Sequence, residues 1–120
     1  MSTLKVNTIE EATSGGATFF TAKTWVNIDG TGSVSIRADG GVSSLTDVGT
    51  GIIDVNFSPS MADALYSAVV ATNDDTGNTS YLTAAGIDYD ECTTSKARIL
   101  TNNSSGGAGD RSYVAMTVTR

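Results

Sequence analysis

The stretch that decides the fold spans residues 25–36 and reads WVNIDGTGSVSI. Apolar side chains alternate with polar ones on both sides of its middle, at Val26, Ile28, Val34 and Ile36. A period of two places apolar residues on one face of a β-strand. Residues 29–32 supply side chains that accept the backbone angles of a tight turn. The stretch therefore predicts a β-hairpin with one buried face.

The same turn chemistry recurs along the chain. Gly combines with Asp, Asn, Ser or Thr, as in hairpin turns, at residues 39–41, 47–51, 74–78 and 104–110. The alternation also returns, with apolar positions at Ile53, Val55, Phe57, Val114, Met116 and Val118. Residues 65–72 are apolar on both faces, which predicts a central strand covered on both sides. Two further strands are expected at residues 80–84 and 97–101.

These seven or eight strands predict an all-β fold, an antiparallel β-sandwich of the jelly-roll type formed by residues 23–120. The helical signal is the sequence SPSMADA at residues 58–64, where Ser suits a helix cap and Pro the first turn. We expect a single helical turn there that links two strands. The sequence contains neither coiled-coil heptads nor a repeat of fixed period.

Residues 1–22 differ from the rest and predict an extended N-terminal arm. They contain one alternating segment at residues 4–9, followed by the flexible sequence TSGG. An isolated strand leaves its backbone unpaired and its apolar face wet, so the arm needs a partner surface. We expect Leu4, Val6 and Ile9 to lie in an interface with another polypeptide.

Composition excludes several classes of function. The chain has 120 residues, a net charge of −6, no His and one Cys. An acidic surface repels phosphate backbones, so we expect no nucleic-acid partner. Without His, and with Cys92 alone, a zinc finger, an internal disulfide and most acid–base catalysis are ruled out. No apolar run is long enough for a signal peptide or a membrane span, so we expect synthesis in the cytoplasm and no membrane insertion.

Trp25 is the aromatic side chain whose position says most about a possible contact surface. Alternation places it on the face opposite Val26, together with Lys23 and Asn27, away from the expected core. A large aromatic ring gains about 1.5–3 kcal/mol when it is buried, so we expect it to be covered. Its own chain, a subunit interface and a stacked sugar are the three candidates, and we include Trp25 among the interface residues.

The acidic clusters do not define a metal or catalytic site. The densest are Asp88, Asp90 and Glu91, and Asp74 with Asp75, but neither has the spacing of a calcium-binding loop. Asp is common in turns because its side chain hydrogen-bonds the local backbone. The Ser95–Lys96 pair is a poor nucleophile–base dyad because adjacent strand residues point to opposite faces. We predict no cofactor, no metal and no enzymatic activity.

Two stretches resemble sequences of a known family. The first is STLKVNTI at residues 2–9, followed by Gly15-Gly16; the second is KTWVNIDGTG at residues 23–32, with residues 36–37, 42–47, 49–51, 55–57 and 61–66 after it. They resemble the segment before the terminal domain of tail-fibre and appendage proteins of tailed bacteriophages, and the start of that β-domain. The resemblance implies a homotrimeric fibre domain whose distal surface contacts host receptors, often polysaccharide.

Together these points predict a noncatalytic phage structural protein, located in the virion, that joins other virion proteins through its arm. A capsid decoration protein is one alternative. A lectin-like module is another, with a host polysaccharide bound by the turn residues Asp74, Asp75, Asn78, Tyr81, Asn102, Asn103 and Asp110. A small polysaccharide-cleaving enzyme is a third, and it lacks an identifiable pair of carboxylates.

Overall fold

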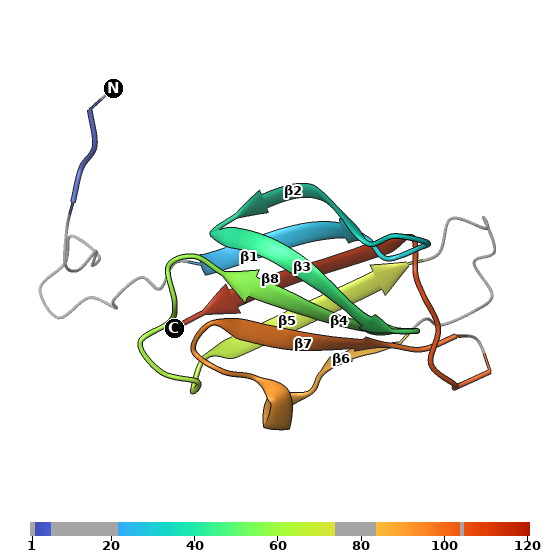
Figure 1. Ribbon diagram of the computed structural model, residues 1–120. Coiled ribbons are helices and arrows are strands. Elements are labelled where there is room, and N and C mark those ends of the chain that lie inside the picture. Colours follow the sequence, from blue (N-terminus) through green and yellow to red (C-terminus); the bar gives the residue numbers. More distant parts are fainter. Residues whose placement is uncertain (1, 6–21, 74–83, 104) are drawn as a thin grey trace, which may run out of the picture.

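The computed structural model describes residues 2–5, 22–73, 84–103 and 105–120 (Figure 1). Within this part of the chain there are eight strands and one short 3₁₀ helix. The strands are β1 (Ala22–Asp29), β2 (Ser35–Gly40), β3 (Val42–Gly49), β4 (Ile52–Phe57), β5 (Ser67–Asn73), β6 (Ala85–Ile87), β7 (Lys96–Thr101) and β8 (Tyr113–Thr119), and the helix η1 spans Tyr89–Glu91.

The strands form two four-stranded sheets, in the orders β2-β1-β8-β5 and β3-β4-β7-β6. Every strand pair is antiparallel, and Figure 1 shows the two sheets as layers that face each other. The first and last strands, β1 and β8, pair at the centre of one sheet. The predicted antiparallel β-sandwich is confirmed, and its first strand begins at Ala22.

The core lies between the sheets and uses the alternating positions that the sequence singles out. Predicted core positions that are buried are Val26, Ile28, Ile53, Val55, Phe57, Val114, Met116 and Val118. Phe57 packs edge-on against Tyr66, with ring centroids 5.6 Å apart. The Tyr66 hydroxyl donates to the backbone oxygen of Lys96 at 2.7 Å. Each fully buried aliphatic side chain stabilises the fold by about 1.5–3 kcal/mol, so this layer supplies most of the stability.

The glycine-rich turns divide into two kinds. Residues 29–32 join β1 to β2, and the turn before Ile52 joins β3 to β4, both as predicted hairpins. Residues 39–41 and 104–110 are different, because each leads from a strand of one sheet to a strand of the other. The hairpin prediction is wrong for residues 39–41. After β7 the chain does make a tight turn, in which Asn102 and Ala108 form an antiparallel bridge, but the next strand, β8, belongs to the other sheet. Gly41, with φ of 76°, adopts a left-handed conformation where the chain passes from β2 to β3.

The predicted helical turn at residues 58–64 is also wrong, because that connection contains bends and no helix. Its backbone groups bond to other segments: the amide of Met61 donates to the oxygen of Thr94 at 2.7 Å. The side chain of Met61 is buried in the core, which fixes the connection across the end of the sandwich. Packing of one apolar side chain therefore overrides the local capping signal.

Residues 65–72 were expected to form a central strand, but β5 lies at the edge of its sheet. Ala68 faces the core, whereas Val69 is 68% exposed. The strand β3, which the sequence pattern does not indicate, pairs with β4 through two register shifts. Of the strand expected at residues 80–84, residues 80–83 lie outside the described residues, and β6 begins at Ala85.

Candidate functional site

The centre of the outer side of the sheet β2-β1-β8-β5 carries no charged residue. The strand registers place two rows of four residues there, one containing Trp25 and the other Asn27. We call this surface the Trp25 face, and its eight residues are Gly40, Trp25, Thr117, Val69, Ala38, Asn27, Ala115 and Ala71. Most of these side chains are small and protrude little from the sheet, whereas Trp25 and Val69 are large and exposed.

Trp25 lies against Gly40 of the neighbouring strand. A Cβ atom built on Gly40 would come within 2.9 Å of Cδ1 and 3.1 Å of Cε2 of the indole. Because Gly40 has no side chain, the indole of Trp25 can pack directly on the backbone of β2. The ring is still 44% exposed, so its own chain covers it only in part. Of the three candidates for its cover, a subunit interface and a stacked sugar stay open for the exposed part.

Asn27 lies at the middle of the Trp25 face with an unsatisfied polar atom. Its side-chain oxygen Oδ1 is buried and has no hydrogen-bond partner among the described residues. Alanines flank it in its row, Ala38 on one side and Ala115 on the other, and they offer no donor. A hollow of about 180 Å³ lies beside it, lined by Asn27, Ala71, Tyr113 and Ala115 among others. A buried amide without a partner is unfavourable and needs an explanation.

Arg37 closes one end of the Trp25 face. Its guanidinium lies over the ring of Tyr113, with Cζ 4.2 Å from the ring centroid. Nη1 donates to the backbone oxygen of Ile28 at 2.8 Å and to that of Ser112. Nη2 is 3.3 Å from Asp29 Oδ2, and hydrogen bonds from Thr31 and the charge of Arg37 lower the pKa of Asp29. The negative charge of Asp29 at this end of the Trp25 face is thus balanced by Arg37.

The opposite sheet carries a charged cluster on its outer side, formed by Asp54, Glu91, Lys96 and Arg98, which we call the Asp54 cluster. Arg98 Nε is 2.7 Å from Asp54 Oδ1, and Lys96 Nζ is 3.0 Å from Oδ2. These donors, Arg98 above all, lower the pKa of Asp54 despite the opposing effect of its burial. The two outer sides of the sandwich therefore differ: one is uncharged at its centre and the other is ionic.

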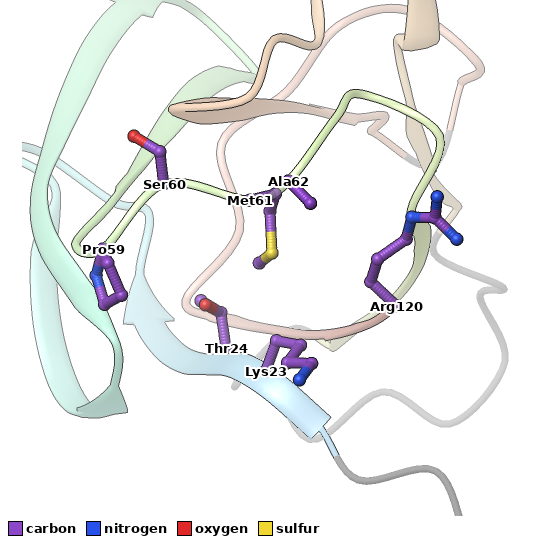
Figure 2. A pocket seen from close by; sticks show the side chains of 7 residues that line it. All are labelled: Lys23, Thr24, Pro59, Ser60, Met61, Ala62 and Arg120. Carbon is purple, nitrogen blue, oxygen red and sulfur yellow. The ribbon is translucent and has the colours of Figure 1, made fainter. Parts of the chain in front are cut away.

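A pocket of about 450 Å³ lies at the end of the sandwich where β1 begins (Figure 2). Its lining residues are Lys23, Thr24, Pro59, Ser60, Met61, Ala62 and Arg120. Figure 2 shows the side chain of Met61 pointing from the β4–β5 connection toward Thr24. Arg120 is held at the rim by Asp63, with Nε 3.0 Å from Oδ1 and Nη2 2.6 Å from Oδ2. Its lining combines the apolar side chains of Pro59, Met61 and Ala62 with two basic and two hydroxyl side chains, and the described lining includes no His, Cys or carboxylate side chain.

The loop residues expected to contact a receptor have structural roles where the structure describes them. Asn103 Oδ1 accepts from the backbone amides of Ser105 at 2.9 Å and Gly107 at 3.0 Å. Asp110 Oδ1 accepts from the Gly51 amide at 2.8 Å, and the backbone oxygen of Asn102 accepts from Arg111. The other four candidates, Asp74, Asp75, Asn78 and Tyr81, lie outside the described residues.

The side chains considered for metal binding and nucleophilic catalysis either bind other groups of the protein or do not come together. In the described part of the chain no three His, Cys, Asp or Glu side chains gather as metal ligands. The Glu91 carboxylate is 3.4 Å from Arg98, and the Lys96 amine binds Asp54 at 3.0 Å. Cys92 Sγ donates to the backbone oxygen of Asp88 at 3.3 Å.

The arm is described only at residues 2–5, which Figure 1 shows apart from the sandwich. Leu4 is 86% exposed there. Val6 and Ile9, the other two expected interface residues of the arm, lie outside the described residues. The interface assigned to Leu4, Val6 and Ile9 therefore stays a prediction.

Comparison with protein-family models, with curated proteins and with solved structures finds no match for this chain. Among the described residues, no helix has the length and apolar character needed to cross a lipid bilayer.

Proposed function

We propose that the protein is a noncatalytic structural protein of a tailed-bacteriophage virion, in which the β-sandwich is a short tail-fibre or appendage domain. In this proposal the domain forms a homotrimer, and the arm attaches it to other virion proteins. The resemblance of residues 2–66 to such domains gives the setting. An acidic surface with no nucleic-acid-binding character suits a protein on the outside of a particle.

The observation that carries this proposal is the exposure of large apolar side chains on a domain whose core is already closed. Leu4 is 86% exposed on the arm, and Val69 is 68% exposed on the Trp25 face. Apolar side chains that gather on one exposed surface mark sites of contact with other molecules, and Val69 shares the Trp25 face with the half-exposed Trp25. An assembly protein needs such surfaces, whereas an enzyme needs a cleft with converging reactive groups.

Incorporation into particles tests the proposal. The expected result is that Leu4→Asp, or deletion of residues 2–16, leaves a folded domain that no longer co-sediments with particles. Thr3→Asp is the matched control, because it adds the same charge at the adjacent exposed position. Retained incorporation of both Leu4→Asp and the deletion variant would refute the role of the arm.

A lectin-like receptor-binding domain is the second candidate function, favoured by the half-exposed indole of Trp25. Aromatic rings of this kind offer an apolar face to a sugar while their polar edge stays hydrated. A glycan array with the full chain decides between the two functions. Saccharide binding that is lost in Trp25→Ala would favour the lectin, and the absence of binding would leave the structural role.

A further inference from the structure

We propose that the Trp25 face is the surface through which copies of this chain associate, with the Asn27 amides of neighbouring copies hydrogen-bonded to one another. This inference rests on the proposed function, because it names the surface and the partner by which the domain assembles.

Charge restricts where identical copies can meet. Each chain carries a net charge of −6, so two copies repel each other, and association is least opposed where the contact surfaces carry no unpaired carboxylates. The eight residues of the Trp25 face are all uncharged, and Asp29 at its end is compensated by Arg37. On the opposite sheet the outer side presents the Asp54 cluster. The Trp25 face is therefore the broad side over which like copies can meet without desolvating an ion-pair cluster.

Shape supports the same surface. Alanine and glycine occupy four of its eight positions, which allows two sheets to approach closely. Val69 is 68% exposed and Trp25 is 44% exposed, so each copy presents two apolar knobs. The hollow of about 180 Å³ beside Asn27 and Ala115 offers a neighbouring copy a place for such a knob. Burial of these side chains supplies the favourable term of association.

Asn27 explains why the partner is a second copy rather than a different protein. An asparagine amide contains both a donor group and an acceptor oxygen, so the same residue from a copy related by rotation satisfies it. Oδ1 is enclosed in the isolated chain and has no partner in the described residues. Rotation about χ2, a soft torsion, turns the amide toward the neighbour. In coiled coils a single buried Asn in the interface likewise specifies register and the number of strands.

The test is the mass of the full chain in solution at several concentrations, by sedimentation equilibrium. We expect Asn27→Asp to lower the association constant at least tenfold at pH 7.5, because it removes the donor and brings like charges together. Asn56→Asp is the matched control: it makes the same substitution near the end of β4, on the opposite outer side. It should associate as the wild type does.

A second pair of variants excludes misfolding as the cause. Val69 and Val48 are both exposed, so Val69→Lys and Val48→Lys should both fold, as far-UV circular dichroism will show. Only Val69→Lys, on the Trp25 face, should weaken association. If the wild type associates, and Asn27→Asp and Val69→Lys associate equally well, the Trp25 face is refuted as the interface, while the proposal that the protein assembles into a homotrimer stands. A wild type that is monomeric at every concentration refutes both the interface and the homotrimer. If the wild type binds a saccharide, and Asn27→Asp and Trp25→Ala lose that binding, the Trp25 face is assigned to a sugar instead.

Discussion

Replacement of Gly40 by alanine tests the packing that shapes the Trp25 face. The new Cβ would come within 2.9 Å of the indole Cδ1, closer than real contacts allow, so the ring must swing outward. Gly40 is not among the glycines with positive φ, so its backbone accepts alanine without strain. The perturbation therefore acts on the ring alone.

The magnitude follows from the area that the ring loses. A tryptophan side chain buries about 150–250 Å² when fully covered. Trp25 exposes 44% of its surface, so somewhat more than half is covered. Loss of about half of that covered area, at about 25 cal/mol per Å², costs about 1 kcal/mol. Alanine also restricts the unfolded chain, which contributes about 0.4–1 kcal/mol in the opposite direction.

A matched control removes this second contribution. Gly86 lies in β6, is not among the positive-φ glycines, and has no atom within 4 Å of an added Cβ. We expect Gly40→Ala to be about 1 kcal/mol less stable than Gly86→Ala in urea unfolding. Trp25 is the sole tryptophan, so the native fluorescence of Gly40→Ala should also shift to longer wavelength. Equal stabilities together with an unchanged emission maximum would show that the indole does not rest on Gly40.

Three further predictions concern the fold. Met116→Ala, at a position 1% exposed in the central strand β8, should lower the free energy of unfolding by about 2–5 kcal/mol in urea titration, and a loss below about 1 kcal/mol would contradict the assigned core. The lowered pKa of Asp54 means that its carboxylate stabilises the fold above the unfolded value of 3.8 and that this contribution disappears as pH falls through the lower folded value. Stability measured from pH 7 to pH 2 should therefore decline less in Asp54→Asn than in the wild type, and parallel declines would argue against the Asp54 cluster. Gly51→Ala should destabilise strongly, because φ is 68° and the new Cβ would lie 2.8 Å from Gly109 N, whereas Gly49→Ala, with open space around it, should leave the melting temperature nearly unchanged.

The central strands were predictable because their signal is local. In β1, β4 and β8, polar and apolar side chains alternate with a period of two, and the inward set is the buried core. The strand β3 interrupts this period at two register shifts, so Val42 and Leu45 stand three residues apart and no alternation appears. The strand β5 looked central because both faces are apolar, although it lies at an edge.

The sheet assignment was not predictable from the turns. Residues 29–32 and 39–41 have similar composition, but the first closes a hairpin and the second carries the chain to the other sheet. A glycine with positive φ reverses the chain in both cases, and which strand pairs next depends on long-range contacts. The same limit applies to the helical signal at residues 58–64, where burial of Met61 decides the conformation.

The site was predictable only in part. Alternation correctly placed Trp25 on the outer side of its sheet, but Gly40 and Asn27 carry no signal of their own. Asn27 Oδ1 lacks a partner because its neighbours in the sheet, which come from two other strands, are alanines without a side-chain donor. Only the three-dimensional register brings these residues together. The Asp54 cluster likewise needs the register between β4 and β7, which brings Asp54 opposite Arg98. Asn103 binds the backbone of its own loop and Asp110 the Gly51 amide of the β3–β4 turn, while their contact with a receptor stays a prediction.

The native mass of the full chain tests the central claim most directly. One chain has a mass of 12.3 kDa, so the proposed trimer has three times that mass, about 37 kDa by light scattering across a dilution series. The account predicts this species at high concentration for the wild type and its loss in Asn27→Asp. A mass of 12.3 kDa at every concentration would contradict it.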